Sequence, residues 1–462
     1  MILSTLLLLI IGYLFAISEY SWKGGLLYTI LVGFIQDPLR KISPIDSSYF
    51  NALALAFFLL TFVVLKNQHK SWYLKYVCWS NKRLLALIPV FLYLLGFQAL
   101  NSFARSGDVR LPIVGLLFYL MPLLAIWIGF HIGSNTKILR NYMIFYLVGC
   151  SLTAISVLLS AQGVENDLFR EVGMGFDITG FGKGNSGFWR TTEIAGWHLA
   201  AGACFAFILG MSESKGFQQS IFFFLSIGLT FLTTTTGRRK AFAMVIVFIS
   251  MYLLYYSLTA KGNKIIRALT AFGMIALLSF SSFGLFFGKE NEADLERFEE
   301  RTSTLTLEET QGRFTFQGVG ALIRGFEIAG PIGLGVGAGS NTGTTGINRG
   351  QLASQDFVSE GGGGRIIAEL GTIGGIFFLY LLFQAAVMYI RNFKMGAMFL
   401  PTEVFSELVG LAMFVFTNLI TFFTAGQLYS DPFVLIIIGL SAGTFLAIPL
   451  LASKQATTSQ QR

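Results

Sequence analysis

Residues 112–132 read PIVGLLFYLMPLLAIWIGFHI, a run without a single Asp, Glu, Lys or Arg. A helix of about 20 apolar residues crosses the hydrocarbon core of a bilayer, and in lipid its backbone groups must be satisfied within the segment. Similar runs of about 17 to 25 residues recur along the chain, which predicts an all-α polytopic membrane protein of about 12 transmembrane helices. The predicted spans are 2–18, 47–65, 84–100, 112–132, 139–162, 193–211, 219–235, 239–258, 264–287, 366–390, 402–425 and 432–451.

The composition indicates the same class of protein. Of the 462 residues, 54% are hydrophobic and 13% are charged, and the mean hydropathy is +0.65. The short alternating segments of an outer-membrane barrel are absent. We attribute the net charge of +8 to cytoplasmic loops rich in Lys and Arg rather than to nucleic-acid binding. The Cys, His, Asp and Glu residues show no spacing typical of a metal site, and no cofactor is predicted.

The apolar stretch 24–36 is too short to classify from the sequence. It could be a thirteenth span, half of a tight hairpin or an interfacial segment. With twelve spans the N-terminus is predicted to be cytoplasmic, and with thirteen it is predicted to lie outside. Either way, one orientation makes the basic loops cytoplasmic; their cations lie within 66–83, 137–140, 261–267 and 391–394.

This orientation predicts the organisation of the chain. Residues 1–287 hold the first nine or ten spans, and 366–451 hold the last three, followed by a cytoplasmic tail, 452–462. A large loop, 288–365, lies outside the membrane between these late helices. The loops 163–192, 101–111 and 236–238 are predicted to lie outside as well.

The loop 288–365 has sequence patterns of its own. It begins with an acidic run interrupted by basic residues, which is typical of a solvated amphipathic helix. The stretch from Gln311 to Gly330 has helical apolar spacing and ends at Gly330-Pro331, a helix stop signal. The glycine run 333–339 lacks the βαβ context of a nucleotide-binding loop, so a turn that lets backbone approach a ligand is the better interpretation.

A cluster of cations stands out in the predicted outside loop 236–238. Arg238, Arg239 and Lys240 follow four threonines and begin a predicted span. Their position opposes both the positive-inside bias and the helix dipole, whose N-terminal end already favours negative charge. Helix N-termini bind phosphate, and Arg adds a bidentate fork for its oxygens. We therefore predict an anion site here; the alternative is a cytoplasmic cluster and a reversed topology.

Two further groups of polar residues are candidates. Arg313, with Arg324 three turns later, lies in the apolar helix of the large loop. Arg190 and Glu193 precede His198 at the outer end of the span 193–211. A hydrogen-bonded structural role is the favoured interpretation of His198, although a His near several Arg residues could also act as a base.

Several motifs resemble those of the O-antigen ligase and O-antigen polymerase superfamily. The Thr-Thr-Gly-Arg-Arg sequence before a span is similar to its T-x-S-R-type motif. Gly312-Arg313 and the later 330–337 resemble its "GR…nPllGvGpG" segment, and 366–375 resembles its "ilaElGilGl" helix start. Residues 188–199 match a further motif loosely. The resemblance covers about residues 180–390.

The resemblance implies a GT-C-like, metal-independent glycosyltransferase in the inner (plasma) membrane, with its active site on the extracytoplasmic side. Such enzymes transfer or polymerise a glycan from a polyprenyl diphosphate-linked donor to an acceptor hydroxyl of a glycan or lipid, and arginines neutralise the leaving diphosphate. The implied catalytic residues are Arg238, Arg239, Arg313 and Glu360. The implied substrate-binding residues are Arg190, Glu193, His198, Arg324 and Arg365.

One departure from the family concerns the base. The family has a His about nine residues before the Glu of its "aElG" motif, and that position is Glu360 in this chain. Partial desolvation could raise the pKa of such a carboxylate and suit it to this role. His198 and Glu193 are alternatives.

Two other functions remain open. A transporter or flippase for an anionic glycan or lipid would have ionisable groups near mid-membrane and internal repeats; no repeat is visible, and Glu369, Glu403 and Glu407 fall near span ends. A non-catalytic scaffold would leave the outside arginines unexplained.

Overall fold

The structure, a computed structural model, is all-helical in the residues that it describes. Those residues are 2–43, 48–68, 81–169, 184–213, 215–259, 314–339, 361–424 and 426–460. Ten helices among them are long and apolar enough to cross a membrane. The predicted all-α architecture is therefore confirmed for these residues, and their many apolar helices are those expected of a multi-pass membrane protein. The predicted span 264–287 lies outside the described residues.

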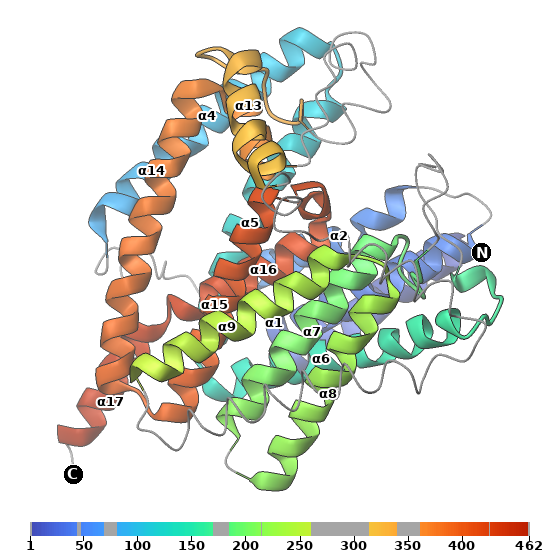
Figure 1. The fold of residues 1–462 in the computed structure, drawn as a ribbon, viewed down its shortest axis with the longest axis vertical. Helices are drawn as coiled ribbons and strands as arrows, with labels where there is room; N and C mark the ends of the chain where they lie inside the picture. Colours follow the sequence, from blue (N-terminus) through green and yellow to red (C-terminus); the bar gives the residue numbers. More distant parts are fainter. Residues whose placement is uncertain are drawn as a thin grey trace. The chain divides into compact units, whose positions relative to one another are not determined.

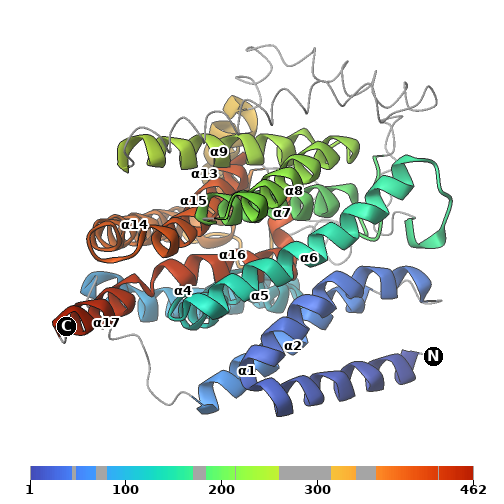
Figure 2. The same ribbon diagram turned by 90° about the horizontal axis from the view of Figure 1, so that it is seen from below.

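The chain forms two compact units, each built from separate parts of the sequence. The first comprises residues 1–70, 136–304 and 402–417, and the second comprises 71–135, 305–401 and 418–462. Figures 1 and 2 show the helices of both units. The helices of the first unit are α1 (Ile2–Ile42), α2 (Leu53–Gln68), α6 (Thr136–Ala161), α7 (Thr192–Ser212), α8 (Gly216–Thr235), α9 (Arg239–Thr259) and the start of α15 (Thr402–Thr424), with the short η1 (Ser48–Ala52) and η2 (Asp167–Phe169).

Helix α1 folds back on itself at Ser21, whose backbone is not helical (φ 62°, ψ −152°). The two arms pack against each other, since the Tyr28 hydroxyl donates to the Leu9 carbonyl at 2.8 Å. Figure 2 shows them side by side. The stretch 24–36 is therefore half of a tight hairpin, one of the three alternatives left open by the sequence, and its helix continues to Ile42.

Helix α7 forms the core of the first unit. It contacts α6, α8 and α9, and nearly all of its residues are buried, including Trp197 and Phe205. Small residues allow this close packing: a Cβ on Gly196 would lie 3.0 Å from Thr236 Oγ1 in the turn that follows α8. The packing therefore brings the start of α7 against the start of α9.

The second unit has its own helices and core. Its helices are α4 (Lys82–Ser106), α5 (Arg110–Gly133), α13 (Ala321–Ala329), α14 (Gly362–Phe399), α16 (Pro432–Phe445) and α17 (Ile448–Gln460), with the π-helical η4 (Phe314–Gly320), the short η7 (Gly426–Ser430) and the end of α15. Glycines let α5 and α16 touch backbone to backbone; a Cβ on Gly129 would lie 2.1 Å from the Leu440 carbonyl oxygen.

Several predicted boundaries are corrected by the structure. The predicted loop 101–111 is short, because α4 continues to Ser106 and α5 begins at Arg110. The predicted span 432–451 lies within one candidate span, Pro432–Ala456, whose helix is interrupted only between α16 and α17. Helix α14 extends beyond 366–390 at both ends. Hydropathy marks the apolar part of a helix and misses the polar turns at its ends.

Candidate functional site

The cation cluster predicted from the sequence lies at a tight turn between α8 and α9. Thr236 ends α8, and Gly237, with φ of 68°, makes the left-handed turn that closes it. The Gly237 amide donates to the Thr234 carbonyl at 3.0 Å, and the Ala241 amide donates to the Arg238 carbonyl at 3.0 Å. Arg238 therefore stands just before the first residue of α9, where the dipole of that helix is positive.

Two residues of α7 hold the Arg238 side chain. Its Nε donates to Thr192 Oγ1 at 2.9 Å, and its Nη1 lies 3.1 Å from Glu193 Oε1. Neither contact uses Nη2, and 46% of the Arg238 side chain is exposed. The protein thus orients the guanidinium, and part of the guanidinium stays exposed. Sequence reasoning missed Thr192.

The same end of the first unit holds a second Arg, which is neutralised. Arg190 Nη1 lies 3.2 Å from Asp37 Oδ1, and the Arg190 amide donates to Asp37 Oδ2 at 3.1 Å. Asp37 has no exposed surface and Arg190 only 13%. We therefore interpret Arg190 as a residue that positions the loop before α7. Asp37 was not predicted, although a carboxylate within an apolar stretch is a signal for a buried partner.

Lys41, near the end of α1, fixes the two described parts of the loop 163–192. Its Nζ donates to the Leu168 carbonyl at 2.9 Å and to the Gly187 carbonyl at 2.7 Å. Lys41 is buried, so these contacts replace water around the ammonium group. Lys41 thereby holds the backbone of this loop at two points, Leu168 and Gly187.

At the other end of the first unit, near the start of α6 and the end of α7, a cation is paired with two carboxylates. Arg140, at the start of α6, contacts Glu213 after α7 and lies 3.5 Å from Glu407 of α15. Both carboxylates are buried, with 8% and 6% of their side chains exposed. This end is predicted from the sequence to be cytoplasmic.

His198 is enclosed in an aromatic cluster of the first unit. Its ring stacks on Trp189 with the centroids 4.0 Å apart, and Nδ1 lies 2.7 Å from the Tyr146 hydroxyl. The residue has no exposed surface. This environment is that of a structural histidine, the interpretation favoured from the sequence.

In the second unit, a loop fills a break in helix α14. Gly371 has φ of 76°, which interrupts the helix. The Leu334 and Gly335 amides donate to the Ala368 and Glu369 carbonyls at 2.9 and 3.1 Å, and the Thr372 amide donates to the Gly330 carbonyl at 3.0 Å. These backbone groups, freed by the break, are satisfied by other backbone groups of the protein. The motifs 330–337 and 366–375 thus lie together.

Arg365 and Glu369 form a buried ion pair next to this break. Arg365 Nε lies 3.1 Å from Glu369 Oε1, and the two side chains are 4% and 0% exposed. Glu369 also accepts from the Tyr119 hydroxyl at 2.8 Å and from the Gly339 amide at 3.1 Å. Arg365 donates to Ser430 and lies over the Phe118 ring. These contacts make Arg365 a structural residue in this conformation.

The remaining predicted residues lie in the large loop. Arg324 is exposed on α13 in the second unit. Arg313 and Glu360 lie outside the described residues, so their predicted roles stay predictions. Helix α13 ends at Ala329, directly before Gly330-Pro331, which confirms the helix and the stop signal predicted there.

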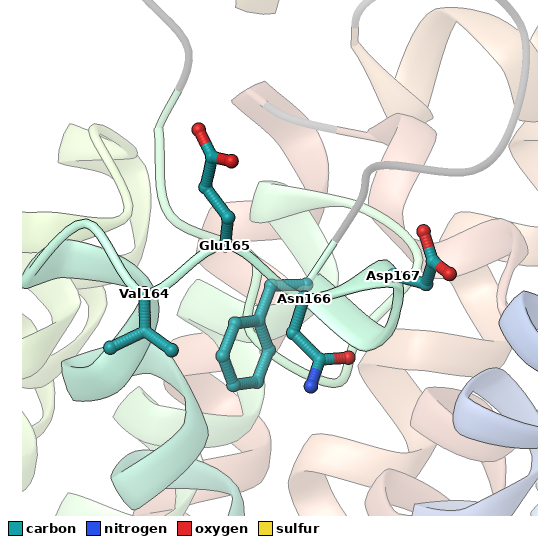
Figure 3. Close-up of a pocket in the computed structure, with 5 residues that line it drawn as sticks. Val164, Glu165, Asn166 and Asp167 are labelled. Atoms are coloured by element: carbon teal, nitrogen blue, oxygen red, sulfur yellow. The ribbon is translucent and has the colours of Figure 1, made fainter.

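The structure also has a hollow on the short segment that follows α6 (Figure 3). It is lined by Val164, Glu165, Asn166, Asp167 and Phe169. The carboxylates of Glu165 and Asp167 extend from different parts of the segment (Figure 3), and no Arg or Lys is among the described lining residues. This hollow is unsuited to an anion, so we place the candidate site at Arg238 instead. Within the described ranges, no three His, Cys, Asp or Glu side chains are grouped as metal ligands.

Comparison with known proteins does not assign a family. No protein-family model matches the sequence, and no curated protein is significantly similar to it.

Proposed function

We propose that this protein is a membrane glycosyltransferase of the O-antigen ligase and polymerase type. It would transfer or polymerise a glycan from a polyprenyl diphosphate-linked donor to an acceptor hydroxyl at the outer face of the inner membrane. The observation that carries the proposal is the Arg238 guanidinium, which Thr192 and Glu193 orient while almost half of it stays exposed. Arg239 and Lys240 follow it directly.

The chemistry of the proposed reaction requires a cation at the leaving group. The acceptor oxygen forms a bond to the anomeric carbon of the donor sugar, while the bond between that carbon and the diphosphate oxygen breaks. The electron pair leaves with the diphosphate, whose negative charge increases. Arginines held in place before the reaction stabilise that charge without reorganising. In our proposal, Arg238 and Arg239 supply this stabilisation.

A base must take the proton of the acceptor hydroxyl. His198 has no exposed surface, so a substrate cannot reach it in this conformation and we do not propose it as the base. Glu193 is 40% exposed but contacts Arg238, so we propose that it orients the guanidinium. Glu360 keeps the role that the family resemblance implies for it.

A transporter is the second candidate, and one observation favours it. Helix α14 is broken at Gly371 beside a buried ion pair, and discontinuous helices with buried charges are common in transporters. However, Glu369 is already engaged by Arg365, Tyr119 and Gly339. A fully satisfied carboxylate indicates a structural role, and we therefore favour transfer.

Reconstitution of the purified protein separates the two functions. Protein in lipid vesicles is given a polyprenyl diphosphate-linked glycan together with a glycan acceptor. We expect a new glycosidic bond and release of polyprenyl diphosphate, both detected by mass spectrometry. Movement of intact donor between leaflets without a new bond would overturn the proposal and favour transport.

A further inference from the structure

Helix α13 has an unusual distribution of side chains in the second unit. The residues that it buries are small: Ala321, Gly325 and Ala329. Two of its large apolar residues face outward, with Ile323 54% and Phe326 37% exposed, while Leu322 and Ile328 are partly buried. A helix that packs on a protein core normally buries its large apolar residues. The exposed Ile323 and Phe326 therefore suggest that an apolar partner covers this face of α13.

The small face of α13 brings the helix directly against the beginning of α14. A Cβ on Gly325 would lie 2.7 Å from the Gly364 carbonyl oxygen, and a Cβ on Gly364 would lie 2.3 Å from the Ala321 carbonyl oxygen. Backbones approach this closely where small residues face each other. Figure 1 shows α13 beside one end of α14, which is a candidate membrane span. Helix α13 therefore lies beside the first turns of that candidate span.

The outward face of α13 continues into the apolar surface of α14. Ile332, which follows α13, is 53% exposed, and Ile373 of α14 is 68% exposed. Their backbones are adjacent, because the Ile373 amide donates to the Pro331 carbonyl at 3.4 Å. Beyond Ile373, α14 exposes Ile376 and Phe383, as a helix surface in contact with lipid does.

The polar residues of α13 border its apolar sector on one side. Arg324 and Glu327 are exposed. At about 100° per residue, Arg324 lies about 100° from Ile323 and about 160° from Phe326 around the helix, whereas Glu327, four residues after Ile323, lies next to the apolar sector. Val319, in the preceding η4, is also exposed, by 43%. Arg324 therefore points to a different side of the helix from Ile323 and Phe326.

We propose that Val319, Ile323 and Phe326 form a membrane-binding face that inserts into the acyl-chain region of the bilayer beside the first turns of α14. The partner is the lipid surface itself. The Arg324 side of α13 lies toward water, and Glu327 lies at the border of the membrane-binding face. This inference does not depend on the proposed transfer reaction.

Site-specific fluorescence in lipid vesicles tests the proposal. An environment-sensitive probe is attached to Ile323→Cys and Phe326→Cys, with Arg324→Cys as the matched control on the same helix. The unsubstituted protein gives the background from its own cysteines. We expect the probes at 323 and 326 to emit at shorter wavelength and to lose intensity in vesicles with brominated acyl chains. The control probe should instead lose intensity with aqueous iodide.

Two results would overturn the proposal. One is equal quenching by brominated lipid at all three positions. The other is short-wavelength emission at 323 and 326 that brominated lipid leaves unchanged, which would mean that protein covers this face. A second measurement needs no substitution. A photoactivatable acyl-chain diazirine should cross-link to residues 319–326 of the unsubstituted protein, and cross-links confined to other segments would count against the membrane-binding face.

Discussion

Arg238 and Glu193 form an ion pair of 3.1 Å in which both side chains remain about half exposed, at 46% and 40%. Exposed pairs contribute little to stability, typically about 0–1 kcal/mol. Stability therefore does not explain why the start of α7 places Glu193 and Thr192 against the cation cluster. We infer that the pair orients the guanidinium for an anion.

This interpretation predicts the effect of Glu193→Gln. Without the negative charge, the ion pair that helps to orient Arg238 is lost, and we expect kcat for glycan transfer to fall about tenfold, equivalent to about 1.4 kcal/mol of transition-state stabilisation. The measurement is steady-state kinetics in lipid vesicles. Glu165→Gln, at an exposed carboxylate of the adjacent loop, is the control. An unchanged kcat with a lower KM would show that Glu193 only screens the cations.

A second prediction concerns the buried pair of the second unit. Glu369→Ala leaves Arg365 buried without its carboxylate, and breaking such a pair costs about 3–5 kcal/mol. We expect a clear fall in the free energy of unfolding, measured by denaturant titration in detergent. Glu403→Ala, at an exposed position in the first turn of α15, should change it little. Equal stability of the two variants would contradict the structural role of Glu369.

A third prediction tests the break in α14. A Cβ at Gly371 would lie 2.4 Å from the Ile332 carbonyl carbon, and φ there is 76°. Gly371→Ala should therefore destabilise the protein by about 1–3 kcal/mol. Gly96→Ala is the matched control, because a Cβ there has no neighbour within 4 Å. Thermal unfolding should separate the two; similar melting temperatures would argue against the break.

The helices were predictable from the sequence, whereas the contacts between them were not. Apolar runs such as 112–132 have the length that a bilayer requires, and α13 has helical spacing followed by Gly330-Pro331. By contrast, the fold-back of α1 occurs at Ser21, a residue that seldom adopts positive φ. The pairing of Asp37 with Arg190 joins residues 153 positions apart, which hydropathy does not record.

The candidate site was predictable in part. The violation of the positive-inside bias identified Arg238 and Arg239 as unusual. It did not reveal that Thr192 and Glu193 hold Arg238, or that Arg365 is engaged by Glu369 and Ser430. Charge patterns show which cations oppose the expected topology, but the partner of each cation depends on helix packing.

The fold of α1 also predicts a topology. Gly24 packs against Ala16 and Tyr28 against Gly12, so the arms are antiparallel. The Ser21 hydroxyl, at the turn, donates to Gln68 at the end of α2. If both arms cross the membrane, the N-terminus lies on the same side as Arg238. We expect an N-terminal tag to be accessible to a protease outside intact cells or spheroplasts, with a C-terminal tag protected. A protected N-terminal tag would contradict this arrangement.

The most direct test of the central claim is the transfer rate of Arg238→Ala and Arg239→Ala in vesicles. The control is Arg110→Ala, at an exposed Arg whose pairing with Asp108 at 2.7 Å lowers the pKa of that carboxyl. It lies far from the start of α9 in sequence and carries no proposed role. We predict that the first two variants insert normally but lose about 100-fold or more in kcat, while Arg110→Ala keeps the unsubstituted rate. Unsubstituted rates in both Arg238→Ala and Arg239→Ala would contradict the account.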